Sequence, residues 1–304
     1  MNPAENALAD HIAERLRTAV IADGQLVAEY RSARFERLVA RMYPTAQRPA
    51  LRAIADVLVW TFLVDDFLDP HRPEGAPERV DRVRAHIDSA LDHRATARPA
   101  DEYLTGWLAA ALDGIDAPDH AWNRHFTDHL REFATALCAE SRVHASGVVP
   151  TVSEFVATRH DTSAWNVCVD LIELQPGATL PERLRRSALA QAMYTRAGEI
   201  VCAINDIISL PKEAAHGERH NLILLIQHHE ACSLPEAVDR VRAYMTERTA
   251  AYLQAKAAFL DHARGHGPQV RTASERFTTG LEHLIRGSYD WMIDTGRYKL
   301  STTT

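Results

Sequence analysis

Two segments of the chain are apolar on almost every face of the helix that each would form. They run from Leu51 to Asp69 and from Ala188 to Glu213. A helix without a polar face is stable in water only where other helices surround it, so both segments are expected at the centre of a helical protein. Each ends in a cluster of acidic or amide side chains, which an apolar core does not tolerate without partners. The sequence therefore predicts two central helices whose polar ends open at the same end of a bundle.

The rest of the chain also has the pattern of helices. Ala, Leu, Arg and Glu are common, and apolar residues recur three and four positions apart, as in residues 26–39. Alternating β-branched runs bounded by turn pairs are missing, which leaves no case for a sheet. Proline- and glycine-rich breaks leave about ten helices. No repeat, low-complexity tract or linker divides the chain, so a single all-α domain over residues 1–304 is predicted.

Composition excludes several classes of protein. The net charge of −7 and the pI near 6.1 argue against a nucleic-acid partner, which requires a basic surface. No apolar run reaches the length that crosses a membrane, and the first residues lack the features of a signal peptide. A monomer or homodimer is expected. The four cysteines, Cys138, Cys168, Cys202 and Cys232, show no paired spacing, so reduced thiols and a cytoplasmic location are expected.

The first polar cluster runs from Asp65 to Asp69. Asp65 and Asp69 share a helix face, whereas Asp66 lies about 100° round the helix. Pro70 disfavours helix at the preceding residue and so places the cluster at a helix C-terminus, where the helix dipole repels anions. Neighbouring carboxylates also repel one another, and a divalent cation is a natural way to hold them together.

The second polar cluster is a column of three oxygen-bearing side chains. Asn205, Ser209 and Glu213 recur every four residues, which stacks them on one face of a helix. An amide oxygen, a hydroxyl and a carboxylate suit a hard cation such as Mg²⁺ better than Zn²⁺ or copper. Lys212 beside them indicates a ligand that carries phosphate. Pro211 removes a backbone donor within this helix and is expected to loosen the turn before Glu213.

At these two clusters the sequence resembles the bacterial class I terpene synthases (terpene cyclases). Residues 65–69 match the aspartate-rich motif of that family, and residues 205–213 match its Asn-Ser-Glu triad. The resemblance implies an all-α fold in which the two motifs face each other across the mouth of a cavity. It also implies three Mg²⁺ ions that bind the diphosphate of an isoprenoid substrate. The implied metal ligands are Asp65 as the main ligand of the first motif, Asp66 and Asp69 as assisting ligands, and Asn205, Ser209 and Glu213 of the second motif.

Three further matches extend the resemblance from about Trp60 to Tyr298. Arg159 lies 46 residues before Asn205, the usual offset of the arginine that senses the diphosphate. The segment that follows resembles the family's helix break, where a backbone carbonyl, here of Thr162 or Ser163, points at the reacting carbon. Near the C-terminus, Trp291 and the Arg297-Tyr298 pair match the final motif of the family. The diphosphate ligands implied by the resemblance are Arg159, Lys212, Arg297 and Tyr298.

The chemistry of the family makes demands on the cavity. Ionisation of a prenyl diphosphate leaves an allylic carbocation, which must be kept from water and faced by aromatic rings. Phe62, one turn before Asp65, and Trp291 are the candidates for such rings. The pocket wall is expected to include Gly198, Val201 and Cys202. Farnesyl diphosphate is the predicted substrate, ahead of geranyl and geranylgeranyl diphosphate, and the product is a sesquiterpene.

Other interpretations compete with this one. A chain-elongating prenyltransferase shares the fold but carries a second aspartate-rich motif in place of the Asn-Ser-Glu triad. A helical protein that only binds a ligand or partner would release no diphosphate. Zinc is suggested by His125 and His129 and by residues 228–232, but neither group has a clear fourth ligand in the sequence, and both are expected to be solvated helix faces.

Overall fold

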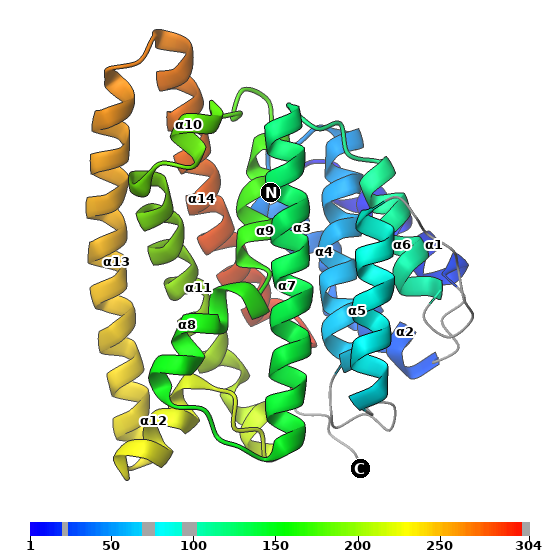
Figure 1. The fold of residues 1–304 in the computed structure, drawn as a ribbon, viewed down its shortest axis with the longest axis vertical. Coiled ribbons are helices and arrows are strands. Elements are labelled where there is room, and N and C mark those ends of the chain that lie inside the picture. The colour runs from blue at the N-terminus through cyan, green and yellow to red at the C-terminus, as the bar shows by residue number, and fades with distance from the viewer. Residues whose placement is uncertain (20–23, 69–76, 93–101, 300–304) are drawn as a thin grey trace.

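In the computed structural model of the chain, residues 1–19, 24–68, 77–92 and 102–299 are described, and every regular element within these ranges is a helix (Figure 1). The prediction of an all-α fold is confirmed. The helices are α1 (Glu5–Thr18), α2 (Gly24–Ala33), α3 (Phe35–Met42), α4 (Arg48–Leu68), α5 (Pro77–Leu91), α6 (Glu102–Asp113), α7 (His120–Ser146), α8 (Val152–Thr162), α9 (Trp165–Asp170), the 3₁₀ helix η1 (Leu171–Leu174), α10 (Glu182–Arg185), α11 (Ala188–Ala215), α12 (Leu222–Glu230), α13 (Leu234–Arg264) and α14 (Pro268–Asp294).

The two segments predicted to be central are α4 and α11. Most residues of α4 are buried, and it packs against α1, α3, α6 and α7. Helix α11 packs along the long helix α13 and also against α8, α12 and α14 (Figure 1). It continues through Pro211 to Ala215, so the expected loosening before Glu213 does not interrupt the helix. Both helices therefore bring their polar C-terminal turns into the interior of the bundle.

Helix α14 returns to the beginning of the chain and fixes the position of the C-terminal segment. At Gly287 a β-carbon would lie 2.8 Å from the backbone of Arg41 and Met42, so only glycine permits this close contact with α3. Further along, Trp291 Nε1 and Thr295 Oγ1 both donate hydrogen bonds to the carbonyl oxygen of Ala33, at 2.7 and 2.8 Å. These contacts direct the residues after Thr295 towards the end of α4.

Three helix boundaries among the described residues lie at non-glycine residues in the left-handed conformation. Arg34, Ala164 and Ala231 have φ angles of +56°, +54° and +47°, the left-handed region that these residue types rarely adopt. Arg34 separates α2 from α3, Ala164 separates α8 from α9, and Ala231 ends α12. The described residues therefore contain more helices than the prolines and glycines predicted; of these three breaks only the one at Ala164 was expected, from the resemblance of the segment after Arg159 to the family's helix break.

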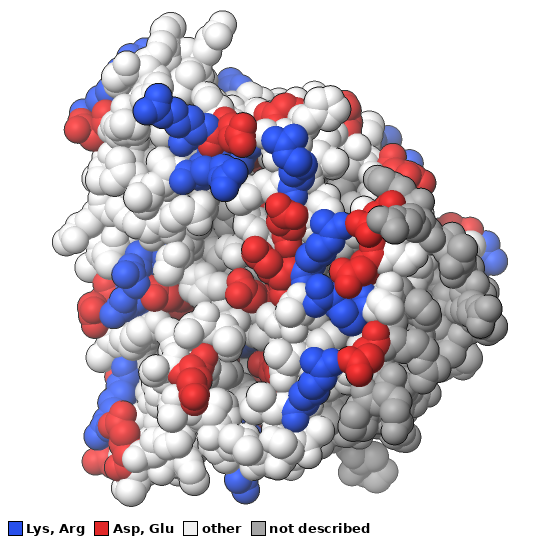
Figure 2. Space-filling model, viewed as in Figure 1, with Lys and Arg blue, Asp and Glu red and all other residues white. Residues whose placement is uncertain are grey.

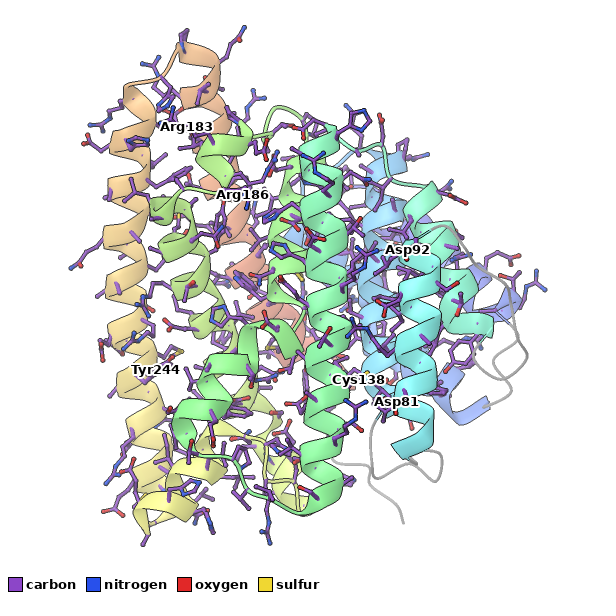
Figure 3. The ribbon with its side chains drawn as sticks, viewed as in Figure 1. Asp81, Asp92, Cys138, Arg183, Arg186 and Tyr244 are labelled. Atoms are coloured by element: carbon purple, nitrogen blue, oxygen red, sulfur yellow. The ribbon has the colours of Figure 1, made fainter. Side chains whose placement is uncertain are left out.

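The surface carries charged side chains of both signs (Figure 2) and also several exposed apolar ones, among them Val148, Leu253 and Ile293. In the view of Figure 2, basic and acidic side chains are interspersed over the coloured residues. At the α5–α7 interface, Asp81 pairs with Arg142 and Asp92 pairs with Arg131 (Figure 3). All four cysteines are free, as expected. No helix among the described residues has both the length and the apolar character that crossing a bilayer requires.

Candidate active site

A cavity of about 670 Å³ lies between α4, α7, α11 and α14. Part of its wall is apolar or aromatic: Leu38, Met42, Leu58, Phe62, Phe133, Leu137, Trp165, Val201, Trp291 and Met292. Another part is polar and charged: Asp65, Asp66, Glu140, Arg159, Asn205, Lys212, Glu213, Arg297 and Tyr298. The structure thus places the polar ends of the two central helices on one cavity, as the sequence predicts.

The last turn of α4 presents two carboxylates to the cavity. Asp66 accepts two hydrogen bonds from Arg297, at 3.0 and 2.8 Å, and one from the Tyr30 hydroxyl at 2.7 Å. Asp65 lies 3.4 Å from Arg297 and has 51 % of its side chain exposed. Enclosure by the cavity and the neighbouring Asp66 charge raise the pKa of Asp65 to about 7, against the opposing effect of Arg297. Asp69, the third predicted ligand of this motif, lies outside the described residues.

Two members of the oxygen column of α11, Asn205 and Glu213, line the same cavity as these carboxylates, whereas Ser209 does not line it. Asn205 Oδ1 accepts a hydrogen bond from Arg159 at 2.9 Å, and Asn205 Nδ2 donates one to the Tyr298 hydroxyl at 2.9 Å. The Ser209 hydroxyl is fully buried and donates to the Asn205 carbonyl at 2.8 Å. Glu213 lines the cavity, and burial together with the Asp206 charge raises the pKa of Glu213.

Arg159, on α8, is held against α11 by two side chains. Besides its bond to Asn205, it lies 3.1 Å from Asp206, whose carboxylate is almost fully buried and also accepts the Leu222 N–H at 3.2 Å. Burial opposes the charge of Arg159, but the Asp206 carboxylate outweighs this effect and keeps the pKa of Arg159 above its usual value. The guanidinium is therefore a fixed positive charge beside Asn205.

The helix break predicted after Arg159 is present. Helix α8 ends at Thr162, Ala164 takes the left-handed conformation, and α9 begins at Trp165. Thr162 and Ser163 both line the cavity, and the Thr162 hydroxyl is buried without a hydrogen-bond partner in the described structure. The break therefore brings backbone to the cavity wall where a straight helix would present only side chains.

Aromatic rings lie directly beneath the charged groups. The guanidinium carbon of Arg297 is 4.8 Å from the centre of the Phe62 ring, and Phe62 lies 5.7 Å from Trp291. Trp291 is 5.8 Å from Tyr298. Gly198, predicted to shape the pocket, faces elsewhere, because a β-carbon there would collide with Trp165 and His160 at 2.6 and 2.8 Å. Its role is the close packing of α11 on the segment around the helix break.

Several residues at the site were not found by sequence reasoning. Tyr30 and Asp206 bind charged site residues directly, and Asn221 donates hydrogen bonds to the Asp206 carbonyl at 2.7 Å and to Glu213 at 2.8 Å. Asp206 could have been found from its position inside the second motif, whereas Tyr30 and Asn221 carry no local signal. The cavity wall also contains a group of His144, Glu218 and His220.

The two histidine groups considered for zinc differ in the structure. His228 and His229 are exposed, as expected of a solvated face, and Cys232 does not join them in a metal-like group among the described residues. His125 and His129 are partly buried and share a third residue, the buried Asp170. The expectation of a solvated face is therefore wrong for that pair.

The chain is similar to known terpene synthases over most of its length. Residues 56–251 match the family described as terpene synthase family 2, C-terminal metal binding. The (+)-T-muurolol synthase ((2E,6E)-farnesyl diphosphate cyclizing) of Roseiflexus castenholzii is 35 % identical over 265 residues, which cover 86 % of this chain and 79 % of that protein. Pristinol synthase of Streptomyces pristinaespiralis is 28 % identical, over 98 % of this chain and 82 % of that protein.

The fold agrees with this similarity. A solved structure of a cucumene synthase variant superposes with a TM-score of 0.83 at 26 % identity and covers 98 % of this chain and 97 % of that one. The match over residues 56–251 includes both polar clusters, Arg159 and the helix break. The chain belongs to the terpene synthase family, within the group of metal-binding terpene synthases.

Proposed function

We propose that the protein is a Mg²⁺-dependent sesquiterpene synthase that ionises farnesyl diphosphate, cyclises the resulting cation and releases diphosphate. The observation that carries the proposal is the pairing of two oxygen clusters across one cavity, with Arg159, Arg297 and Tyr298 bound to them. The similarity to a synthase named for farnesyl diphosphate cyclisation supports the choice of substrate. A cavity of about 670 Å³ is also of the size that holds ligands of this class.

The donor atoms suit Mg²⁺. The candidate ligands are all oxygens, and the Arg297 guanidinium on Asp66 indicates that this position requires a positive charge. Three ions are proposed, with Asp65 as the main ligand of α4, assisted by Asp66 and Asp69. The ligands on α11 are Asn205, Ser209 and Glu213. When bound, the ions would supply positive charge that stabilises the departing diphosphate.

The chain itself contributes further positive charge to the leaving group. Arg159 and Arg297 are fixed in place by carboxylates, and Lys212 lines the same cavity. The Tyr298 hydroxyl, which accepts from Asn205, is positioned to donate to a phosphate oxygen. Because these groups are in place before substrate binds, they require little reorganisation as negative charge develops.

The aromatic part of the cavity wall would protect the carbocation. Phe62 and Trp291 present aromatic rings beneath the diphosphate site, where their faces can stabilise positive charge. At the helix break, the carbonyls of Asp161 and Ala164 accept backbone hydrogen bonds, which leaves those of Thr162 and Ser163 as the two candidates to face the reacting carbon. The apolar lining excludes the water that would quench the cation.

We also propose that residues 1–304 act as one domain. The main apolar core joins residues from both ends of the chain, from Leu8 on α1 to Met292 on α14. The smaller core around Phe155 and Ile223 packs on α11 from the side of α12. No part of the cavity could therefore be completed by one half of the chain alone.

The test is incubation of the protein with farnesyl diphosphate, with Mg²⁺ or with excess chelator. Organic extracts are examined by gas chromatography and mass spectrometry, and diphosphate release is measured in parallel. Geranyl and geranylgeranyl diphosphate are supplied separately, because a preference for either would assign a mono- or diterpene synthase. The expected result is a C15 terpene and equimolar diphosphate, in the presence of Mg²⁺ only.

Two other outcomes would overturn the proposal. A longer prenyl diphosphate that forms only when isopentenyl diphosphate is added would indicate a chain-elongating prenyltransferase. No diphosphate release from any of the three substrates would indicate a protein that only binds its ligand. Asp81→Ala serves as the matched control for later active-site variants, since Asp81 is an exposed helical aspartate that does not line the cavity.

A further inference from the structure

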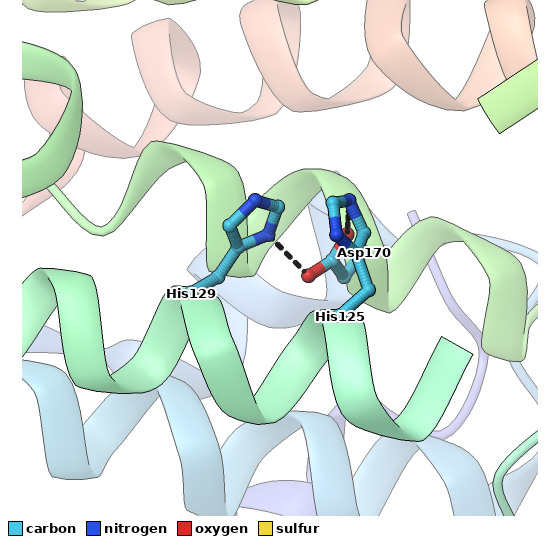
Figure 4. Close-up of side chains that lie close together, drawn as sticks. All are labelled: His125, His129 and Asp170. Carbon is cyan, nitrogen blue, oxygen red and sulfur yellow. Dashed lines mark hydrogen bonds and ion pairs between the residues drawn. The ribbon is translucent and has the colours of Figure 1, made fainter. Parts of the chain in front are cut away.

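Three side chains outside the cavity lining converge between α7 and the end of α9 (Figure 4). His125 and His129 lie one helical turn apart on α7, and their ring centres are 4.1 Å apart. The Asp170 carboxylate faces both rings: one oxygen is 2.6 Å from His129 Nδ1 and the other is 3.8 Å from His125 Nε2. One donor atom from each residue can be chosen so that all three lie within 4.8 Å of one another.

The donor set is that of a transition-metal site. Two imidazoles and one carboxylate form the protein part of many zinc centres in which water takes the fourth position, and a pair of histidines four residues apart on a helix is a common way to supply two of them. Bonds of about 2.0–2.1 Å at tetrahedral angles place donor atoms about 3.3 Å apart. The observed separations of 2.6 and 3.8 Å lie on either side of that value but involve different oxygens of the carboxylate, so the side chains would have to rotate for one oxygen and both nitrogens to reach it.

We propose that His125, His129 and Asp170 bind one Zn²⁺ ion, which joins α7 to α9 on the side away from the cavity. Asp170 is 3 % exposed and the histidine side chains are 20 and 15 % exposed, so the position is shielded but accessible from outside. The backbone of Asp170 is fixed independently, because its carbonyl accepts the Trp122 Nε1–H at 3.1 Å. The ligand positions are therefore largely preformed.

The surrounding charges are compatible with a cation. Glu132 and Asp161 are the further acidic groups whose charges reach His129, whereas Arg185 and Arg186 act on His125 from α10 and its end (Figure 3 labels Arg186).

The position of the site gives the ion a structural role. Helix α9 starts at the break that brings Thr162 and Ser163 to the cavity, and it ends at Asp170. A metal at Asp170 would fix the far end of α9 against α7, while Cys168, two residues earlier, lines the cavity. Neither histidine nor Asp170 lines the cavity, so the ion would take no direct part in the reaction.

The test uses Co²⁺ as a spectroscopic probe for the zinc position. The metal-free full-length protein is titrated with Co²⁺ in the presence of excess Mg²⁺, which occupies oxygen-ligand sites. Visible absorption then reports tetrahedral coordination, and Zn²⁺ is added to displace the Co²⁺. The variant is His125→Gln with His129→Gln. The control is His262→Gln with His266→Gln, because that pair has the same spacing and ring centres 5.1 Å apart but joins no such three-residue group among the described residues.

The expected result is one Co²⁺ bound by the wild type and by the control, with affinity at least about a hundredfold weaker in the His125/His129 variant. Zn²⁺ should also raise the Tm of the wild type and the control, but not that of the variant. Equal stoichiometry and affinity in all three proteins would overturn the proposal, as would the absence of bound Co²⁺ in the wild type. Circular dichroism verifies that the variant is folded, and Asp170→Asn provides a second variant if it is not. Terpene formation is not a readout, so failure of this proposal is distinct from failure of the proposed function.

Discussion

The guanidinium of Arg297 donates a bidentate pair of hydrogen bonds to the carboxylate of Asp66, from Nη1 to Oδ2 at 3.0 Å and from Nη2 to Oδ1 at 2.8 Å. The two residues are 231 positions apart, so this contact docks the C-terminal segment onto the end of α4. The same carboxylate edge is the one that a divalent cation would approach. Arg297 would therefore compete with the metal proposed at Asp66, and the diphosphate of the proposed substrate would offer Arg297 an alternative partner.

This competition predicts opposite effects of Arg297→Gln on metal affinity and on turnover. Mg²⁺ affinity measured without substrate should rise about tenfold, because a positive charge that occupies the carboxylates is removed. Turnover, as kcat/KM, should fall about a hundredfold or more, because the developing negative charge loses a fixed donor. Calorimetric titration measures the Mg²⁺ affinity, and steady-state kinetics measures kcat/KM. Arg286→Gln is the control, since Arg286 is an exposed arginine of α14 paired with Asp290. Weaker Mg²⁺ binding in Arg297→Gln would refute the competition.

Asp65→Ala and Asn205→Ala should each abolish Mg²⁺-dependent product formation while leaving the helices folded. Asp65 is half exposed and is repelled by Asp66, so its loss removes a candidate ligand at little cost in stability. Product formation and thermal unfolding are measured for both variants beside Asp81→Ala. Wild-type product yield in either variant would show that the metal ligands are assigned wrongly.

Asp206→Asn tests the residue that positions Arg159. The amide would leave the buried guanidinium without its carboxylate, which typically costs about 3–5 kcal/mol of folding free energy. Where the variant remains folded, KM for the prenyl diphosphate should rise more than kcat falls, because Arg159 is present but less well held. Urea unfolding measures the loss of folding free energy, and steady-state kinetics measures KM and kcat. Unchanged stability and KM would mean that Asn205 alone holds Arg159 in place.

Stability at acid pH should depend on Glu218. Burial opposes its charge, but hydrogen bonds from His220 and the Arg219 N–H outweigh it and lower the pKa of Glu218 to about 2 from an ordinary value of 4.5. A lowered carboxyl pKa stabilises the folded state above the unfolded-state value, and this contribution is lost as the pH falls through the folded-state value. Glu218→Gln should therefore cost about 2–3 kcal/mol at pH 7.

The pH series provides the check on that value. Urea unfolding of the wild type and of Glu218→Gln is compared from pH 7 downwards. The difference in unfolding free energy should stay constant to about pH 5 and then shrink towards pH 2. A difference that does not change with pH would mean that Glu218 stabilises the fold through packing and not through its charge.

Ala164→Gly should stabilise the protein. Ala164 has a φ of +54°, which costs an alanine about 1–2 kcal/mol and a glycine almost nothing. The net gain is expected to be about 0.5–1 kcal/mol after the greater flexibility of the unfolded glycine chain is counted. Ala203→Gly, in the middle of α11, should instead destabilise by about 1 kcal/mol or more. Equal effects of the two substitutions on Tm would contradict the strain at the helix break.

The sequence predicted those parts of the site that depend on one helix. Asp65 and Asp66, like Asn205 and Glu213, are brought together by helical periodicity alone, and the hydrophobicity of α4 and α11 placed them in the centre. The contacts of Tyr30 with Asp66 and of Asn221 with Glu213 depend on how separate segments pack, for which the residues carry no periodic signal.

The helix boundaries show the same limit. Prolines and glycines predicted most breaks, but Arg34, Ala164 and Ala231 are held in the left-handed conformation by their surroundings and not by their own preference. The prediction for Gly198 was wrong for another reason: the sequence placed it on the cavity side of α11, whereas its lack of a side chain allows close packing against Trp165.

The carbonyl of Ala33, which accepts hydrogen bonds from Trp291 and Thr295, also has a consequence for synthesis on the ribosome. Ala33 emerges first, and its two donors emerge only 258 and 262 residues later. Until then Arg297 cannot reach Asp66, and the cavity lacks the wall formed by α14. A nascent chain therefore lacks one of the proposed diphosphate ligands for as long as it lacks this wall, so the proposed ionisation and the enclosure of the cation would become possible at the same stage of synthesis.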